Sequence, residues 1–427
     1  MADFISALPA LALSPAQVAA RCRHLPGMVF FDSALDVAGD ALSLIAAEPE
    51  QIMTGQTEAD WKMLHEAIAA RQSPSAAPEK IPQGFAAGWV DYDGAFCFGF
   101  YDKLLAYRHQ DGAWFAVGGA YTQWSELLEN GRDGTPCRPG AHGVYADAPH
   151  LCFAPTIQRS DFLRMVERAQ EYIAAGDIYQ VNLSHRLVAP WTVGDPFLFY
   201  EALRRCSPAP HAAFLELNGR SVLSSSPELF LEMRGHAIRT RPIKGTRPRG
   251  SNPAADANNA EALVLSPKEM AELIMITDLE RNDLGQVCAF GSVAVTELLK
   301  LERFEQVFHL VSTVDGRLRA DVDHLTALRA CFPGGSITGA PKKRAREIIA
   351  ELEPEPRGLY TGAIGYLGFN GTSQFNIAIR TVVIENDIAH FHVGAGIVAD
   401  SQAEMEWQET LDKAAGILLA VENIGCV

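Results

Sequence analysis

The chain has 427 residues, of which 48% are hydrophobic and 21% are charged, a composition typical of a folded enzyme rather than a disordered protein. Its 36 Lys and Arg against 52 Asp and Glu give a net charge of −16, which disfavours nucleic acids and anionic membranes as partners because both bind basic surfaces. No apolar run approaches the roughly 20 residues that span a bilayer. There is no Cys-x-x-Cys pair among the eight cysteines, and the acidic N-terminus lacks the pattern of a secretory signal, so we expect reduced thiols and a cytoplasmic location.

The composition changes most clearly at residues 131–149, which are rich in Gly, Pro, Asp and Ala and show neither helical nor strand periodicity. We therefore expect a boundary there, with a smaller N-terminal region over residues 1–148 and a larger region over residues 149–427. Within the first region, residues 73–78 form another loop-like stretch. Short strand-like runs in this region lie at residues 29–31 and 88–92.

The second region begins with a helix pattern followed by a strand pattern. Ser160 can cap a helix that ends at Gly176, since Ser favours the first position of a helix and Gly its C-terminal turn. Residues 178–188 alternate apolar and polar side chains, which predicts a strand with Gln180 on its polar face. The irregular alternation of helices and strand clusters predicts an α+β fold with largely antiparallel sheets. Further strand candidates lie at residues 221–224, 229–231, 375–384 and 389–393.

Two ionisable residues stand in or near turns of this region. Glu228 lies in a Ser-Ser-Pro-Glu turn, where it can act as a general acid if burial raises its pKa, although such a Glu is more often solvated. Lys244 stands in Pro-Ile-Lys-Gly-Thr, residues 242–246, where a backbone bend and apolar neighbours can desolvate its amine. Desolvation disfavours the ammonium form, so Lys244 is a candidate nucleophile, although most Lys-Gly-Thr strings are simply turns.

Acidic residues recur at helical spacing in two places. Ser266 and Pro267 mark a helix start, and Glu269 and Glu272 then lie on one face of that helix. Two such helices that meet in space would supply carboxylate ligands for Mg²⁺. The alternative is structural, because Glu269 can complete a capping box and the second helix contains an ordinary i,i+4 ion pair. The residues of that second helix are Glu406, Glu409 and Lys413.

A histidine and an arginine further along the chain are further candidates for a site. His309 interrupts an apolar run and is either a satisfied core histidine or part of a site. Arg380 follows the strand-like residues 375–379, and its guanidinium is the residue type best suited to bind a carboxylate through two hydrogen bonds.

Two glycine segments resemble nucleotide-binding motifs but fail their requirements. Residues 332–342 carry Ala340 where a phosphate-binding loop requires lysine. Residues 394–399 match a loose dinucleotide fingerprint, but too few residues follow for the βαβ unit that such a site needs. What remains in both segments is bare backbone N–H groups that a carboxylate can bind.

Taken together, these segments resemble the chorismate-utilising enzymes, which include anthranilate synthase component I, isochorismate and salicylate synthases, and aminodeoxychorismate synthase component I. The resemblance covers roughly residues 155–425 and is fainter before residue 150. It implies a large interleaved α+β fold with two mainly antiparallel sheets packed together and helices outside. The motifs that carry it are residues 176–183 (GDIYQVNL), 226–228 (SPE), 278–284 (DLERNDL), 332–342 (FPGGSITGAPK) and 394–396 (GAG).

Two positions sort the family members. Gln180 stands where the water-using synthases have a lysine base, and Lys244 stands where anthranilate synthases have alanine. The resemblance therefore implies the reaction of aminodeoxychorismate synthase, in which Lys244 attacks carbon 2 of chorismate and Glu228 acts as general acid. Ammonia would then enter at carbon 4 to give 4-amino-4-deoxychorismate, the precursor of p-aminobenzoate and folate. Arg241, Arg247 and Arg249 would help to keep the amine of Lys244 neutral.

The resemblance also implies the ligand-binding residues. Glu272 and Glu409 would bind Mg²⁺ directly, with Glu269 and Glu406 close by. The metal would hold the ring carboxylate of chorismate beside Gly245, Thr246 and His309. The enolpyruvyl carboxylate would be bound by Tyr360, Arg380, the backbone of Gly394, Ala395 and Gly396, and Lys413.

Ammonia requires a source outside the sequence given. No Gly-x-Cys-x-Gly nucleophile motif of a glutaminase is present, so we expect a separate glutamine amidotransferase subunit as partner. Residues 210–212 depart from the segment with which some relatives bind tryptophan, which leaves a tryptophan site in doubt. Two alternatives stay open, namely anthranilate synthase component I and a non-catalytic chorismate-binding subunit.

Overall fold

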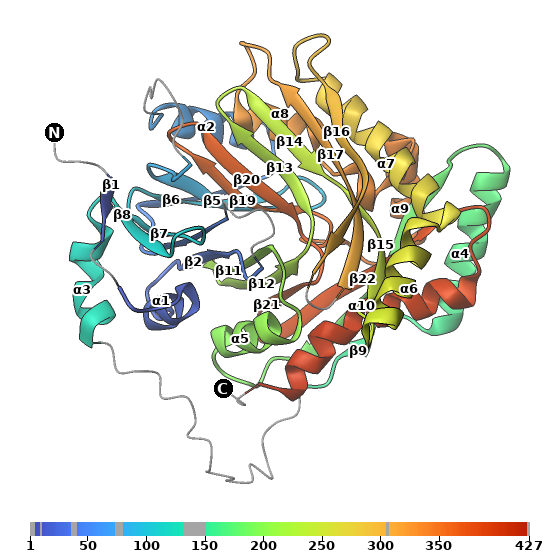
Figure 1. The fold of residues 1–427 in the computed structure, drawn as a ribbon, viewed down its shortest axis with the longest axis horizontal. Helices are drawn as coiled ribbons and strands as arrows, with labels where there is room; N and C mark the ends of the chain where they lie inside the picture. Colours follow the sequence, from blue (N-terminus) through green and yellow to red (C-terminus); the bar gives the residue numbers. More distant parts are fainter. Residues whose placement is uncertain are drawn as a thin grey trace, which may run out of the picture.

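The computed structural model describes residues 5–8, 11–35, 41–72, 80–130, 151–304 and 307–424. Two antiparallel sheets face each other and helices cover their outer sides, as Figure 1 shows, so the predicted α+β fold is confirmed. Ten α-helices are described: α1 (Pro15–Cys22), α2 (Glu58–Ala69), α3 (Ala120–Asn130), α4 (Arg159–Ala174), α5 (Pro196–Cys206), α6 (Pro253–Val264), α7 (Pro267–Gly285), α8 (His324–Cys331), α9 (Lys342–Leu352) and α10 (Ala403–Glu422).

The first sheet has twelve described strands. Their order is β1 (Ile5–Ala7), β8 (Ala113–Val117), β7 (Leu104–Arg108), β3 (Leu42–Ala46), β2 (Val29–Asp32), β11 (His211–Leu217), β12 (Arg220–Ser226), β21 (Thr381–Glu385), β22 (Ile388–Ile397), β10 (Gln180–Pro190) and β18 (Gly339–Ala340), with β9 (Ala154–Pro155) also paired to β10.

The second sheet has ten described strands. Their order is β15 (Ile243–Pro248), β17 (Val307–Arg317), β14 (Ala237–Arg241), β13 (Leu229–Arg234), β20 (Thr372–Ile377), β19 (Ala363–Gly368), β5 (Phe85–Val90), β6 (Phe96–Tyr101) and β4 (Gln51–Gly55), with β16 (Ala294–Arg303) also paired to β17.

Strands from both halves of the chain share both sheets. In the first sheet, Phe30 of β2 pairs with Phe214 of β11, and in the second sheet Gly88 of β5 pairs with Gly365 of β19. The fold is therefore interleaved. The expected loops at residues 73–78 and 131–149, and with them the boundary at residue 148, lie outside the described residues, so the division into two regions stays a prediction.

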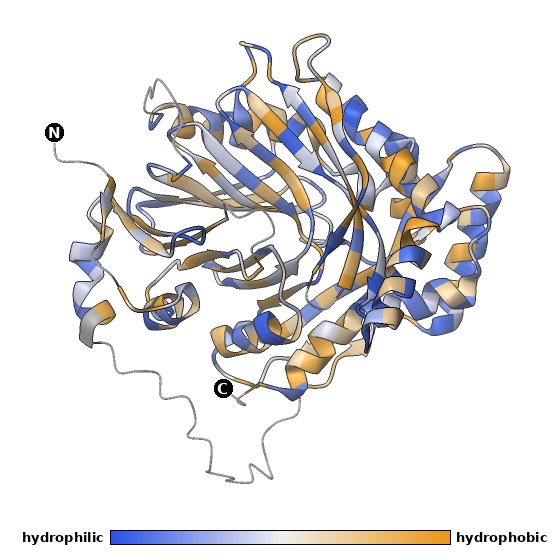
Figure 2. Ribbon diagram, in the orientation of Figure 1, coloured by the Kyte–Doolittle hydropathy of each residue, from blue (hydrophilic) through white to orange (hydrophobic). Residues whose placement is uncertain are grey.

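Apolar side chains pack in part of the space between the sheets and in the space under the helices. One buried cluster joins Val29 and Leu44 of the first sheet to Phe85 and Trp89 of the second. Another places Ile417 of α10 on the outer side of the first sheet. Figure 2 shows that many helices have one hydrophilic and one hydrophobic face, which agrees with this burial.

Two element predictions need correction. The helix predicted from Ser160 begins earlier, because Gln158 and Asp161 form its capping box, and it is followed by Gly176 at a positive φ of 82°. The single strand predicted over residues 375–384 is two strands in different sheets, β20 and β21. The chain crosses between the sheets at Arg380, whose φ of 49° does not fit a continuous strand.

Candidate active site

Lys244 lies in β15 at a break in the strand register. The pairing with β17 shifts directly after Lys244, where Gly245 adopts a φ of 71°. A Cβ atom on Gly245 would lie 2.7 Å from Cδ1 of Leu263, so both the backbone conformation and the space favour glycine. The predicted bend is therefore present, and Nζ of Lys244 donates a hydrogen bond of 3.3 Å to the carbonyl oxygen of Ser336.

The three arginines near Lys244 do not act as free positive charges. Each is paired with a carboxylate, which offsets its electrostatic effect on the lysine. The pairs are Arg241 with Glu302, Arg247 with Glu269, and Arg249 with Asp256.

Glu228 lies in the turn between β12 and β13, as predicted, but it is only 5% exposed rather than solvated. Its backbone carbonyl accepts a hydrogen bond of 3.1 Å from the N–H of Ile377, which fixes the turn against β20. Burial raises the pKa of the Glu228 carboxyl above its usual value, and the Ser336 hydroxyl and Lys244 oppose this shift in part. The environment therefore favours the protonated form that a general acid needs.

Gln180 and Gly396 lie beside Lys244. Gln180 is fully buried, and neither its amide nitrogen nor its amide oxygen has a hydrogen-bond partner among the described residues. A Cβ atom on Gly396 would lie 2.9 Å from Nε2 of Gln180 and 3.8 Å from Nζ of Lys244. The side chain of Ala395 packs in the cluster beneath α4 and α9, which leaves only its backbone, the part that the resemblance assigns to substrate binding. An unpaired buried amide is costly, so a polar ligand at this point would be favourable.

A second group of predicted residues gathers around Gly394. A Cβ atom there would lie 2.7 Å from the hydroxyl oxygen of Tyr360. Lys413 of α10 donates a hydrogen bond of 2.8 Å to the carbonyl oxygen of Gly394 and forms an ion pair of 2.7 Å with Glu409. The guanidinium of Arg380 has no hydrogen-bond or ion-pair partner within the described part of the chain, and burial lowers its pKa. A bound carboxylate would supply the negatively charged partner that this guanidinium lacks.

Thr246 and His309 are joined across β15 and β17. The Thr246 hydroxyl lies 3.0 Å from Nδ1 of His309, and the ring of Phe304 packs edge-on against the imidazole. Burial, reinforced by the charge of Arg380, lowers the pKa of His309 to about 4. The imidazole is therefore neutral near pH 7, and it is both a satisfied core histidine and a neighbour of the predicted site.

The two acidic helix starts lie close together. Nζ of Lys268 lies 3.9 Å from Oε1 of Glu272 on α7 and 3.8 Å from Oε1 of Glu406 on α10. Burial raises the pKa of Glu272 and of Glu406. For Glu409, burial acts in the same direction, but the ion pair with Lys413 outweighs it and the pKa is lowered.

These carboxylates fit Mg²⁺ by chemistry, although they are not gathered as metal ligands. The Oε2 atom of Glu406 is buried without a hydrogen-bond partner among the described residues, and carboxylate oxygens are the ligands that Mg²⁺ prefers. Within the described ranges, no group of three or more His, Cys, Asp or Glu side chains is arranged to hold a metal. The alternative, in which these residues serve the helix itself, is partly present, since the Ser266 side chain caps α7 by accepting a hydrogen bond from the N–H of Glu269. The Mg²⁺ site therefore stays a prediction.

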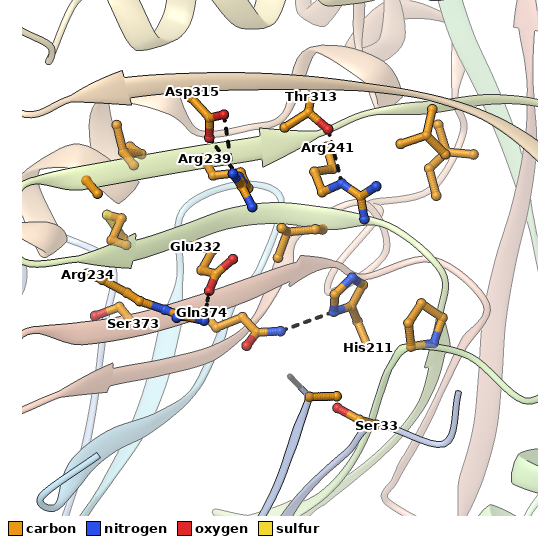
Figure 3. A pocket seen from close by; sticks show the side chains of 18 of the residues that line it. Ser33, His211, Glu232, Arg234, Arg239, Arg241, Thr313, Asp315, Ser373 and Gln374 are labelled. Carbon is orange, nitrogen blue, oxygen red and sulfur yellow. Dashed lines mark hydrogen bonds and ion pairs between the residues drawn. The ribbon is translucent and has the colours of Figure 1, made fainter. Parts of the chain in front are cut away.

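A cavity of about 1000 Å³ lies between the sheets. The side chains of Lys244, Glu228 and Arg380 are not part of its lining. Figure 3 shows that its polar groups interact with one another: Arg239 pairs with Asp315, and Gln374 bonds to His211 at 3.1 Å. Burial lowers the pKa of His211 to about 3, with a smaller effect from Arg241. The cavity is also lined by Pro227 and Ile243, the residues that directly precede Glu228 and Lys244.

Three residues near the site carry interactions that sequence reasoning did not assign. Lys268 bridges the acidic helices, Ser336 accepts the hydrogen bond of Lys244, and Glu280 is a carboxylate that is only 3% exposed. A motif match over residues 278–284 contains Glu280, but a helical surface pattern gives no sign of what a buried carboxylate binds.

Comparison with known proteins identifies relatives of this chain. A family model described as chorismate binding enzyme matches residues 30–419. Anthranilate synthase component 1 1 from Haloarcula marismortui is 48% identical over 285 residues, which are 67% of this chain and 58% of that protein. Aminodeoxychorismate synthase component 1 from Bacillus subtilis is 44% identical over 270 residues, which are 63% of this chain and 57% of that protein. The chain thus covers less than two thirds of the length of these relatives.

Solved structures of related enzymes have the same fold as this chain. Anthranilate synthase component I from Streptococcus pneumoniae superposes with a TM-score of 0.76 at 30% identity, over 90% of this chain and 93% of that one. The menaquinone-specific isochorismate synthase from Escherichia coli gives a TM-score of 0.75 over 98% of this chain and 94% of that one, and at 19% identity this likeness shows the fold alone. No helix among the described residues is long and apolar enough to cross a membrane. By its sequence match and its fold, the chain belongs to the chorismate binding enzyme family.

Proposed function

We propose that this chain is component I of an aminodeoxychorismate synthase, which converts chorismate and ammonia to 4-amino-4-deoxychorismate through a covalent intermediate on Lys244. The observation that carries the proposal is the position of Lys244. Its Nζ contacts the carbonyl of Ser336 and lies beside the backbone of Gly396, and it is near enough to Glu228 and Glu272 to influence the pKa of each carboxyl. The residues proposed as nucleophile and as acid thus lie close to each other and to an acidic helix start, which supports the proposal.

In the first step, the lone pair of Lys244 forms a bond to carbon 2 of chorismate. The two ring double bonds shift, and the bond from carbon 4 to its hydroxyl oxygen breaks. Glu228 donates its proton to that oxygen, so the hydroxyl leaves as water and Glu228 becomes a carboxylate. The burial that raises the pKa of Glu228 supports this role, because it favours the protonated form of the carboxyl relative to an exposed glutamate.

In the second step, ammonia forms a bond to carbon 4. The double bonds shift back, and the bond between carbon 2 and Lys244 breaks with release of the neutral amine. The new ammonium group then returns a proton to Glu228. The sum is chorismate and ammonia to 4-amino-4-deoxychorismate and water, a product suited to p-aminobenzoate and folate synthesis.

The two carboxylates of chorismate would be bound at opposite ends of the site. Arg380, Tyr360, the backbone at residues 394–396 and Lys413 would take the enolpyruvyl carboxylate, since Arg380 has no charge partner among the described residues. Gly245, Thr246 and neutral His309 would lie near the ring carboxylate. Mg²⁺ held by Glu272 and Glu409, with Glu269 and Glu406 close by, would offset the charge of that carboxylate.

A glutamine amidotransferase subunit would supply the ammonia. Three of the named relatives are designated component 1 or component I, which implies a second component in those proteins. For this chain, the partner is part of the proposal.

Anthranilate synthase component I is the second candidate, because the Haloarcula relative of that name is 48% identical. That reaction would put ammonia at carbon 2, the position that the Lys244 side chain would occupy in our proposal. A non-catalytic chorismate-binding protein is the alternative of another class.

Product identification separates these functions. Purified protein is incubated with chorismate, Mg²⁺ and excess ammonium, and the products are resolved by chromatography and mass spectrometry. Our proposal predicts 4-amino-4-deoxychorismate. Anthranilate would support the second candidate, and unchanged chorismate would support the binding protein.

A further inference from the structure

The glycine segment at residues 332–342 does not present all of its backbone N–H groups to a ligand. It forms the short 3-10 helix η1 (Gly335–Ile337) and strand β18, which pairs with Gln180 and Val181 of β10. The carbonyl oxygen of Ser336 in this segment is the acceptor for Nζ of Lys244. The position of this segment therefore determines the position of the lysine amine.

Glu280 of α7 binds the beginning of the segment. Its Oε1 atom accepts a hydrogen bond of 2.9 Å from the N–H of Gly335, the residue directly before Ser336. The contact is close, because a Cβ atom on Gly335 would lie 2.6 Å from Cδ2 of Leu279 and 3.1 Å from Oε1 of Glu280. A buried carboxylate thus takes a backbone N–H that sequence analysis left available to substrate.

The same helix binds the end of the segment one turn later. Asp283 is 2% exposed and forms an ion pair with Lys342, whose Nζ also donates to the carbonyl oxygen of Cys331 at 3.0 Å. The segment is therefore attached to α7 at both ends. Between these attachments, Ser336 faces Lys244.

We propose that Glu280 is a positioning residue, which orients the nucleophilic amine of Lys244 by holding Gly335 and, through it, the carbonyl of Ser336. This inference rests on the proposed function, in which Lys244 attacks chorismate. A neutral amine has two N–H groups and one lone pair. When the Ser336 carbonyl accepts one N–H, fewer orientations of the lone pair remain, so this contact can hold the lone pair toward the reacting carbon. Small errors in such alignment reduce the rate of attack strongly.

Two variants of Glu280 and one control test this role. Glu280→Ala removes the acceptor for Gly335, whereas Glu280→Gln keeps an amide oxygen in its place and removes only the charge. The control is Asp278→Ala on the same helix, because its side chain is 73% exposed and pairs only with Arg281 in the described structure. For each protein, kcat and KM for chorismate consumption are measured per folded molecule, together with the rate of Lys244 adduct formation without ammonia.

We expect Glu280→Ala to lower kcat and the rate of adduct formation by about 10- to 100-fold, with KM changed less than about threefold. Glu280→Gln and Asp278→Ala should stay within about threefold of the unmodified protein in both rates. The inference is overturned if Glu280→Ala keeps the full kcat per folded molecule. It is also overturned if Glu280→Gln loses as much activity as Glu280→Ala, since charge rather than the hydrogen bond would then matter.

The failure of this inference and the failure of the proposed function can be told apart. If the unmodified protein consumes chorismate without a Lys244 adduct, the proposed function fails, and the inference that depends on it fails as well. If the adduct forms at equal rates in the unmodified protein and in Glu280→Ala, only the role of Glu280 is refuted.

Discussion

Gly245→Ala should destabilise the protein and move Lys244 out of position. Gly245 adopts a φ of 71° in β15, a conformation that costs an alanine about 1–2 kcal/mol. The new Cβ atom would also lie 2.7 Å from Cδ1 of Leu263. Relief of that overlap requires shifts that typically cost about 1–3 kcal/mol. The two effects together predict a loss of about 2–5 kcal/mol in the free energy of unfolding.

Gly219→Ala is a matched control that separates strain from crowding. Gly219 has a φ of 75° in the turn between β11 and β12, but a Cβ atom there would meet no atom within 4 Å. This variant should therefore lose only the conformational cost of about 1–2 kcal/mol. Because the turn lies away from Lys244 in sequence and carries no residue of the proposed site, chorismate turnover should remain unchanged.

Urea unfolding, followed by circular dichroism and tryptophan fluorescence, gives the free energies for both variants, and steady-state assays give kcat. We expect Gly245→Ala to lose more stability than Gly219→Ala and to lose most of its turnover. Equal losses of stability with full turnover in Gly245→Ala would refute the reasoning, because β15 could then move without displacing the lysine.

Three further substitutions test the proposed roles. Lys244→Ala should abolish 4-amino-4-deoxychorismate formation while its unfolding free energy changes by less than about 1.5 kcal/mol, measured by product analysis and urea unfolding. Arg380→Gln should raise KM for chorismate by about 10- to 100-fold, since a charge-assisted hydrogen bond contributes about 1.5–3 kcal/mol, and initial-rate kinetics would reveal it. Glu228→Gln should abolish turnover. Because the pKa of Glu228 is raised in the folded protein, its stabilisation is full below the unfolded carboxyl pKa and is lost as pH rises through the folded value. The unfolding free energy of Glu228→Gln, measured against pH, should therefore increase relative to that of the unmodified protein as pH rises.

Local sequence chemistry predicted the parts of the site that depend on single turns and helix starts. The Pro-Ile-Lys-Gly-Thr bend and the Ser266 cap are both present in the structure. These features follow from glycine conformation and helix capping, which act within a few residues. A pattern of strands and helices was likewise enough to predict antiparallel sheets.

Features that depend on long-range packing could not be predicted. The alternating run at residues 375–384 reads as one strand, but the chain passes from one sheet to the other at Arg380. Burial of Glu228 depends on contacts with β20, which is more than 140 residues away in sequence. The carboxylate partner of Gly335 comes from α7, 55 residues earlier. Sequence periodicity carries no information about such pairings.

Intact-protein and peptide mass spectrometry after mixing the protein with chorismate and Mg²⁺, without ammonia, tests the central claim most directly. We predict a chorismate-derived adduct, formed with loss of water, on the peptide that contains Lys244, and its disappearance with release of 4-amino-4-deoxychorismate when ammonium is added. Chorismate turnover to anthranilate on addition of ammonium, without any adduct on Lys244, would contradict the account.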